Sequence, residues 1–90
     1  MTVWVDSMNA PFGRMKMSHM IADSTEELLA MAKLIGVQAK WLQRTGTPYE
    51  HFDISQSKKA LAIKHGAVEI TTMEMGRKIH ARRLAQEIEP

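Results

Sequence analysis

The sequence predicts one small α/β domain, in which a sheet of about four strands packs with three helices in the order β-β-α-β-α-β-α. The chain has 90 residues, which leaves room for only one hydrophobic core. Its composition, 44% hydrophobic and 24% charged, is that of a globular protein. Short β-branched segments alternate with segments of helical periodicity, and this alternation favours at least one parallel pair of strands.

Two strands are predicted before the first helix. The segment TVWV, residues 2–5, is β-branched and aromatic and predicts a central first strand that ends at Asp6. Residues 7–16 contain proline and glycine, which indicate a loop. The segment MSHMIA, residues 17–22, is close to alternating and therefore predicts the second strand.

The first helix has the clearest signals in the sequence. We expect it to begin at residues 23–25, whose side-chain oxygens can cap free backbone N–H groups, and two glutamates follow at its positive end. Gly36 supplies the left-handed stop. The spacing i, i+3, i+4 and i+7 gives one apolar stripe, formed by Leu28, Met31, Ala32 and Ile35.

The middle of the chain is expected to form two more extended segments and a second helix. A short strand is predicted at residues 39–42, followed by a loop that contains glycine and proline. The segment HFDI, residues 51–54, predicts a brief extended piece. Ser55 or Ser57 can cap the helix that follows, and Gly66 ends it.

A last strand and a third helix are predicted at the C-terminal end. The segment AVEIT, residues 67–71, predicts the strand, and the helix runs from there to the C-terminus. We expect its basic residues Lys78, Arg82 and Arg83 to lie mostly opposite its apolar face. That apolar face is predicted to contain Met73, Ala81, Leu84, Ala85 and Ile88.

The composition excludes several kinds of function. The chain has no cysteine, which excludes disulfides, thiol catalysis and thiolate zinc sites and fits a reducing, cytoplasmic location. No apolar run approaches the roughly 18 residues of a membrane span, and residues 1–10 show no basic secretory leader. The formal charge of +2 is weak evidence for a nucleic-acid partner.

Several segments together resemble a known family. They are MTVWVD at the N-terminus, PFGRM, SHMIAD before an acidic helix, an isolated tryptophan, and HFDISQSKKALAIKHGAVEIT. Their order and spacing over residues 1–71 are similar to those of a short bacterial and bacteriophage family, domain of unknown function number four-thousand-and-thirty-one (DUF4031). The positions that match best are Asp6, Arg14, His19, Asp23, Trp41, Asp53, Lys58 and Gly66.

The resemblance implies a small intracellular bacterial or bacteriophage protein and transfers no activity to the chain. The predicted C-terminal helix, residues 73–90, lies outside the familiar portion, so the resemblance carries no information about its role. We interpret residues 1–90 as a single domain.

His19 and His51 are the candidate catalytic residues. They lie at the same place in two similar strand–helix units, and if the two strands are neighbours both imidazoles face one cleft. One histidine could then take a proton and the other give one. Two-histidine phosphoesterases carry a hydroxyl residue two places after each histidine, where this chain has Ile21 and Asp53, so that family is not supported. The alternative is that both histidines end strands and bond to backbone or aspartate.

The junction HFDISQSKK, residues 51–59, also predicts an anion site. Lys58 and Lys59 occupy the first turn of a predicted helix, where free backbone N–H groups attract anions. Arg14 could add a two-pronged phosphate contact. We therefore predict a pocket that binds a phosphate-bearing ligand, a nucleotide or nucleic acid. The candidate ligand-binding residues are Arg14, Asp53, Ser55, Lys58, Lys59 and Trp41.

A metal site was weighed against this interpretation. Oxygen and imidazole donors of this kind suit manganese, magnesium or iron better than structural zinc. Their separations in the sequence are long and irregular, unlike a helical metal signature. We therefore predict no metal site and no cofactor. The donors in question are Asp6, His19, Asp23, His51 and Asp53.

A non-enzymatic function is the alternative. The segment GRKIHARR, residues 76–83, could contact phosphates, although acidic residues share the final third of the chain and a solvated helical face is the default. The methionine-rich residues 8–20 could instead attach a bacteriophage protein to a host protein, or simply fill an irregular core. The sequence leaves open whether the protein is an enzyme and which oligomeric state it adopts.

Overall fold

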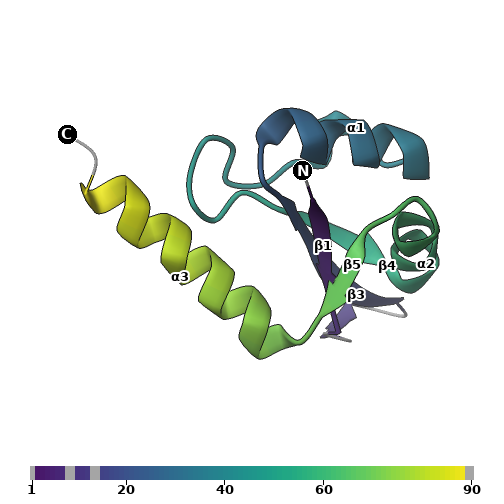
Figure 1. The fold of residues 1–90 in the computed structure, drawn as a ribbon. Helices are drawn as coiled ribbons and strands as arrows, with labels where there is room; N and C mark the ends of the chain where they lie inside the picture. Colours follow the sequence, from purple (N-terminus) through teal and green to yellow (C-terminus); the bar gives the residue numbers. More distant parts are fainter. Residues whose placement is uncertain (1, 8–9, 13–14, 89–90) are drawn as a thin grey trace.

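The computed structural model describes residues 2–7, 10–12 and 15–88 of the chain. Figure 1 shows a mixed sheet with α1 and α2 on one side and α3 running along the other. The predicted α/β class, helix count and element order are confirmed. The elements are β1 (Val3–Asp6), β2 (Ala10–Phe12), β3 (Met15–Ala22), α1 (Thr25–Ile35), the 3-10 helix η1 (Ala39–Trp41), β4 (Phe52–Ser55), α2 (Gln56–Lys64), β5 (Val68–Ile70) and α3 (Thr72–Ile88).

Strand β3 organises the sheet. It pairs antiparallel with β1, β2 and β4. Strand β1 also pairs with β5, and this pair is parallel, as the alternation of elements predicts. Within the described strands, β1 lies between β3 and β5, so the prediction of a central first strand is confirmed.

The two faces of the sheet carry different side chains because successive strand residues point to opposite sides. The face toward α1 and α2 holds the larger apolar cluster, to which β1 contributes Val3 and Val5 and α1 contributes Leu28. The face toward α3 holds a small cluster of Ile21, Ile70 and Met75, with partly buried neighbours. The strands therefore place alternate residues in a thick core and beneath a single helix.

The predicted helix caps are confirmed. Ser24 accepts a hydrogen bond from the backbone N–H of Glu27 at the start of α1, and Gly36 ends that helix with a φ of 79°. Ser55 does the same for the N–H of Lys58 at the start of α2. No helix in the described part of the chain has the length and apolar character needed to cross a membrane.

The strand predicted at residues 39–42 is wrong, because these residues form the 3-10 helix η1. Its backbone is satisfied locally: the N–H of Trp41 donates to Gln38 and that of Leu42 to Ala39. Residues 39–41 are exposed and bury no alternating apolar face, so sheet pairing gains them little. In the segment between η1 and β4, strand pairing is limited to a single bridge between Gln43 and His51.

The loop predicted at residues 7–16 is also only partly correct. Ala10–Phe12 forms the short strand β2, and strand β3 begins earlier than predicted, at Met15. Pro11 has no backbone N–H to donate, and proline is tolerated in strands that pair on one side only. Strand β2 has one partner, β3, among the described strands.

The predicted orientation of the C-terminal helix is wrong. Met75 is 3% exposed and packs on the sheet, whereas Met73 and Leu84 are exposed. Two predicted outward cations face the sheet instead: the Lys78 ammonium lies 3.9 Å from the centroid of the Trp4 ring, and Arg82 donates to the Ala22 carbonyl. Long cationic side chains cover apolar surface with their methylene stems, so apolar residues alone did not identify the inner face.

Candidate functional site

A row of three polar residues crosses the sheet on the face toward α3. Val5 pairs with Met20, so the next step of the antiparallel register sets Asp6 opposite His19. His19 in turn pairs directly with Asp53 of β4. Directly paired side chains on one face lie about 5 Å apart at Cβ. The sheet therefore brings together residues that are far apart in the sequence.

Asp6 and His19 form a buried contact at the centre of this row. The Asp6 side chain is fully buried, and its Oδ2 lies 2.7 Å from His19 Nδ1. Its Oδ1 accepts the backbone N–H of His19 at 2.9 Å. The hydrogen bond from Asp6 raises the pKa of His19, because it stabilises the protonated ring more than burial destabilises it, and Asp53 adds in the same direction.

His51 lies beside His19, just before β4. Their ring centroids are 5.4 Å apart in an edge-to-face arrangement. His51 Nδ1 donates to the carbonyl of Tyr49 at 2.6 Å, since a carbonyl oxygen can only accept. That bond turns Nε2 toward Asp53, whose Oδ1 is 3.5 Å away.

Asp53 stands between the two imidazoles. Its Oδ1 lies 3.6 Å from His19 Nε2, and its Oδ2 accepts a hydrogen bond from Gln43 Nε2 at 2.7 Å. One ligand atom from each of His19, His51 and Asp53 lies within 4.8 Å of the other two. These three residues are the set that could hold a metal ion within the described part of the chain.

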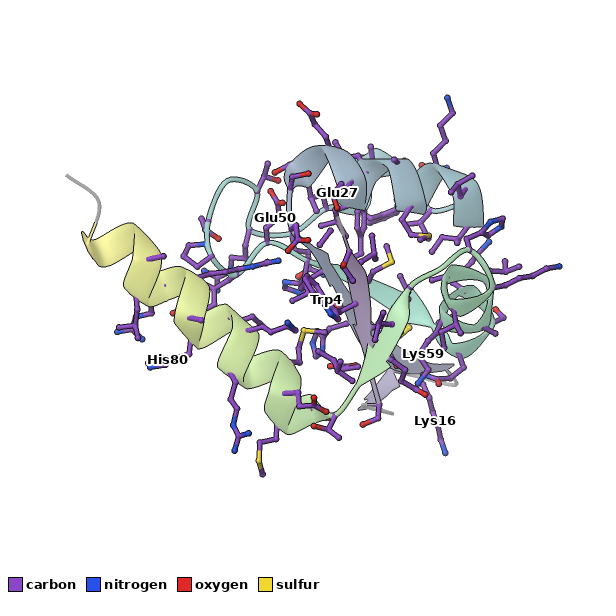
Figure 2. The ribbon with its side chains drawn as sticks, viewed as in Figure 1. Trp4, Lys16, Glu27, Glu50, Lys59 and His80 are labelled. Atoms are coloured by element: carbon purple, nitrogen blue, oxygen red, sulfur yellow. The ribbon has the colours of Figure 1, made fainter. Side chains whose placement is uncertain are left out.

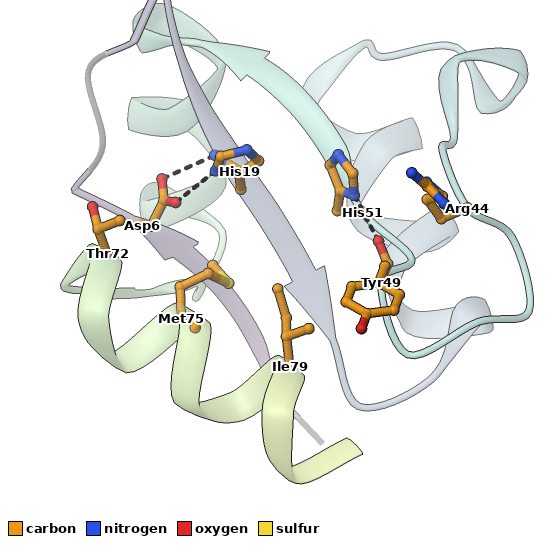
Figure 3. Close-up of a pocket in the computed structure, with 9 residues that line it drawn as sticks. Asp6, His19, Arg44, Tyr49, His51, Thr72, Met75 and Ile79 are labelled. Atoms are coloured by element: carbon orange, nitrogen blue, oxygen red, sulfur yellow. Dashed lines mark hydrogen bonds and ion pairs between the residues drawn. The ribbon is translucent and has the colours of Figure 1, made fainter. Parts of the chain in front are cut away.

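A pocket of about 590 Å³ opens beside the two histidines. Figure 3 shows His19 and Asp6 on one side, His51 near Tyr49 and Arg44 on the other, and α3 contributing Met75 and Ile79. The wall is thus part polar, from the sheet and the residue 44–51 loop, and part apolar, from the helix. Volumes of this size accommodate small ligands.

The two lysines of the predicted anion site lie elsewhere. Lys58 reaches the C-terminal end of α1, where its Nζ is 3.1 Å from the position a Cβ on Gly36 would take. Lys59 pairs with Glu69 at 2.9 Å and donates to the Asp6 carbonyl at 3.3 Å. Figure 2 shows Lys59 on the α2 side of the molecule. Neither lysine lines the pocket.

The remaining candidates are also dispersed. Ser55 serves as the α2 cap, and its hydroxyl lies 3.1 Å from that of Ser57. Trp41 is 62% exposed on η1 and does not line the pocket. Asp23 accepts the backbone N–H of Thr2 at the start of α1 and is separate from the histidines. Arg14 lies outside the described residues.

Sequence reasoning missed three residues that complete the site. Gln43 orients Asp53, the Tyr49 carbonyl orients His51, and Arg44 lines the pocket. The sequence signal for this site was limited to His51 and Asp53, whose spacing of two residues puts both on one face of an extended segment. Nothing local to the sequence indicated that residues 43 and 44 would lie against them.

The comparisons with known proteins identify a family for this chain. The profile of the family described as Protein of unknown function (DUF4031) matches residues 3–82, so the chain belongs to that family. The match extends beyond residue 71, where the motifs of the sequence end, and includes much of α3. No curated protein and no solved structure matches the chain.

Proposed function

We propose that this DUF4031 member binds a phosphate-bearing ligand, a nucleotide or a nucleic acid, in the pocket between the sheet and α3. The observation that supports this is the meeting of Arg44 with the imidazoles of His19 and His51 on one pocket. A guanidinium binds phosphate oxygens through paired N–H groups, and a protonated imidazole can add a charge-assisted hydrogen bond. An apolar wall from α3 would contact the remainder of the ligand.

Arg44 takes the role that was predicted for the junction lysines, Lys58 and Lys59. Among the described residues, its guanidinium has no hydrogen-bond or ion-pair partner, so it is available to a ligand. Its backbone adopts a left-handed conformation with a φ of 57°. Non-glycine residues adopt this conformation uncommonly and at a cost, and they concentrate at ligand sites.

His19 and His51 remain the candidate catalytic residues within this proposal. Asp6 fixes the ring of His19 and the Tyr49 carbonyl fixes that of His51, so each ring presents its Nε2 edge. A positioned imidazole is the commonest general acid or base. Both roles require that the ligand binds in this pocket, so binding is the function to test first.

The test is a titration of the protein with nucleoside mono-, di- and triphosphates and short oligonucleotides, followed by imidazole NMR. We expect the signals of His19 and His51 to shift while those of exposed His80 stay fixed. Arg44→Gln should weaken binding about tenfold, the loss of one charged contact worth about 1.4 kcal/mol. The matched control is Arg77→Gln on α3, whose guanidinium donates to the sulfur of Met73 and does not line the pocket. Unmoved histidine signals with every ligand would refute the proposal.

Among the described residues, the exposed apolar side chains are spread over several elements and do not favour the alternative of a host-protein interaction. The large exposed apolar side chains belong to α1, η1, α2, β5 and α3 and to the loop before β4. Most of the methionine-rich loop that suggested a partner has no described side chains. A bacteriophage origin remains an implication of the sequence resemblance, and the absence of cysteine is what supports a cytoplasmic location.

A further inference from the structure

We propose that His19, His51 and Asp53 form a binding site for one divalent transition-metal ion. The ligand atoms are His19 Nε2, His51 Nε2 and a carboxylate oxygen of Asp53. This inference goes beyond phosphate binding and does not depend on it. It also differs from the expectation from the sequence, in which irregular spacing argued against a metal.

The hydrogen bonds around the two rings leave the correct atoms available. His19 Nδ1 faces the Asp6 carboxylate and His51 Nδ1 faces the Tyr49 carbonyl, so in each neutral ring Nδ1 carries the hydrogen. The two Nε2 lone pairs then point toward Asp53 Oδ1, which is a third acceptor. Three acceptor atoms that converge repel one another unless a cation lies between them.

The distances fit a metal better than a shared proton. Hydrogen bonds between imidazolium and carboxylate are typically about 2.7–2.9 Å long. Here the two nitrogen–oxygen separations are 3.5 and 3.6 Å. Two ligand atoms bound to one tetrahedral ion at about 2.1 Å would lie about 3.4 Å apart. The third separation, between the two Nε2 atoms, is at most 4.8 Å, and the rings would turn toward each other to bind one ion.

The surrounding residues support the ligands as they do in established metal sites. Metal-binding histidines usually donate their other ring N–H to a carboxylate or backbone carbonyl, which fixes the tautomer and raises ligand basicity. Asp6 and the Tyr49 carbonyl occupy these positions, and Gln43 holds the second oxygen of Asp53. All three ligands therefore have a hydrogen-bond partner that orients them.

The chemistry of the set indicates the class of ion. Two imidazoles and one carboxylate suit zinc, iron(II), manganese or cobalt, whereas magnesium and calcium prefer oxygen donors. Three protein ligands leave at least one coordination position for water or an added ligand. Because His19 and His51 line the pocket, that position would face the space next to Arg44.

A divalent ion would also change the charge of the pocket. Asp6 and Asp53 bring two carboxylates to the site, and Lys58 and Lys59, which the sequence placed there, lie elsewhere. A bound ion offsets both carboxylates, so that Arg44 is left as an excess positive charge. An anionic ligand would then be attracted more strongly than by the pocket without the ion.

The experiment uses untagged, chelator-treated full-length protein, titrated with zinc by calorimetry and with cobalt by visible absorption. We expect one equivalent of each ion to bind. The cobalt spectrum should indicate about four to six ligands, namely the three protein side chains and the added water molecules or ligand atoms. His51→Ala and Asp53→Asn should each weaken binding about 100-fold or more, given that even outer-shell changes cost 10–100-fold. Circular dichroism establishes that the variants are folded.

Matched controls separate this site from adventitious binding. His80→Ala removes an imidazole from the exposed outer face of α3, as Figure 2 shows, and Glu26→Gln removes an exposed carboxylate from α1. Both should bind zinc like the unmodified protein. The proposal is overturned if no stoichiometric binding occurs, or if the site variants and the controls bind equally well.

The metal titration and the nucleotide titration can refute the two proposals separately. Stoichiometric zinc binding with no nucleotide binding, with or without the ion, would retain the metal site and refute the proposed function. The chelator-treated protein could instead bind nucleotide, with no effect of added zinc and no binding of zinc itself. That result would support the proposed function and refute the metal site. Nucleotide binding that requires one equivalent of zinc would support both.

Discussion

The two faces of the sheet differ in composition, although the same strands form both: one face packs an apolar core and the other carries polar groups beside a pocket. Toward α1 and α2, the strands bury a continuous apolar cluster that includes fully buried Phe52 and Ile54. Toward α3 they bury only a small cluster, together with the carboxylate of Asp6, and leave a pocket of about 590 Å³. The comparison indicates that the first face supplies most of the stability. The second face can therefore contain charged groups, whose burial would destabilise an apolar core.

Truncating one buried side chain on each face should give the largest effects that test this comparison. Ile54→Ala should lower the free energy of unfolding by about 4 kcal/mol and Met75→Ala by about 2 kcal/mol, within the usual range for such deletions. The loss is smaller for Met75 because its side chain borders a pocket that solvent already reaches. Urea unfolding measures both values. An equal or larger loss for Met75→Ala would contradict the division between the faces.

The buried carboxylate gives a second, smaller effect. Asp6→Asn should cost about 2 kcal/mol, because an amide cannot accept from both the backbone N–H and the ring of His19 and leaves a buried group unsatisfied. The pKa of His19 should fall at the same time, since its main stabilising partner is lost. NMR titration of His19 in the variant measures this fall. An unchanged His19 pKa would show that Asp6 is not the cause of the shift.

The pH dependence of stability is the smallest expected effect. The pKa of His19 is higher in the folded chain than its value of about 6.5 in the unfolded chain. Its contribution to stability is therefore fully present below about pH 6.5 and is lost as the pH rises through the folded-state value. Unfolding of the protein and of His19→Gln is compared from about one pH unit below 6.5 to about two and a half units above it, and the difference isolates the contribution of His19. A difference that grows as the pH rises would have the wrong sign.

The fold could largely be predicted because its main elements carry local signals. Ser24 and Gly36 mark the ends of α1, and the alternation around His19 marks β3. The errors arose where tertiary contacts decide the outcome. Residues 39–41 have the composition of a strand but no neighbour to pair with, and α3 packs with an edge that includes the stems of Lys78 and Arg82.

The site was predictable in part for the same reason. Strand pairing brings His19 and His51 together, as the sequence interpretation required, because β3 pairs with β4 and His51 directly precedes β4. The destinations of Lys58 and Lys59 were not predictable, since long side chains reach whichever partner the folded chain offers. The positions of residues 43 and 44 depend on a loop that only the complete fold places beside β4.

The location of Asp6, His19 and Asp53 on paired strands has a consequence for how this protein could be altered. The hydrogen bonds between the strands hold their backbones at a fixed spacing, so the three side chains are positioned by the fold before any ligand binds. Arg44 and the inner side chains of α3, by contrast, belong to a loop and a single helix that can change without disturbing the paired strands. Selectivity could therefore be redesigned at the rim by substituting those residues while the constellation on the strands is left intact.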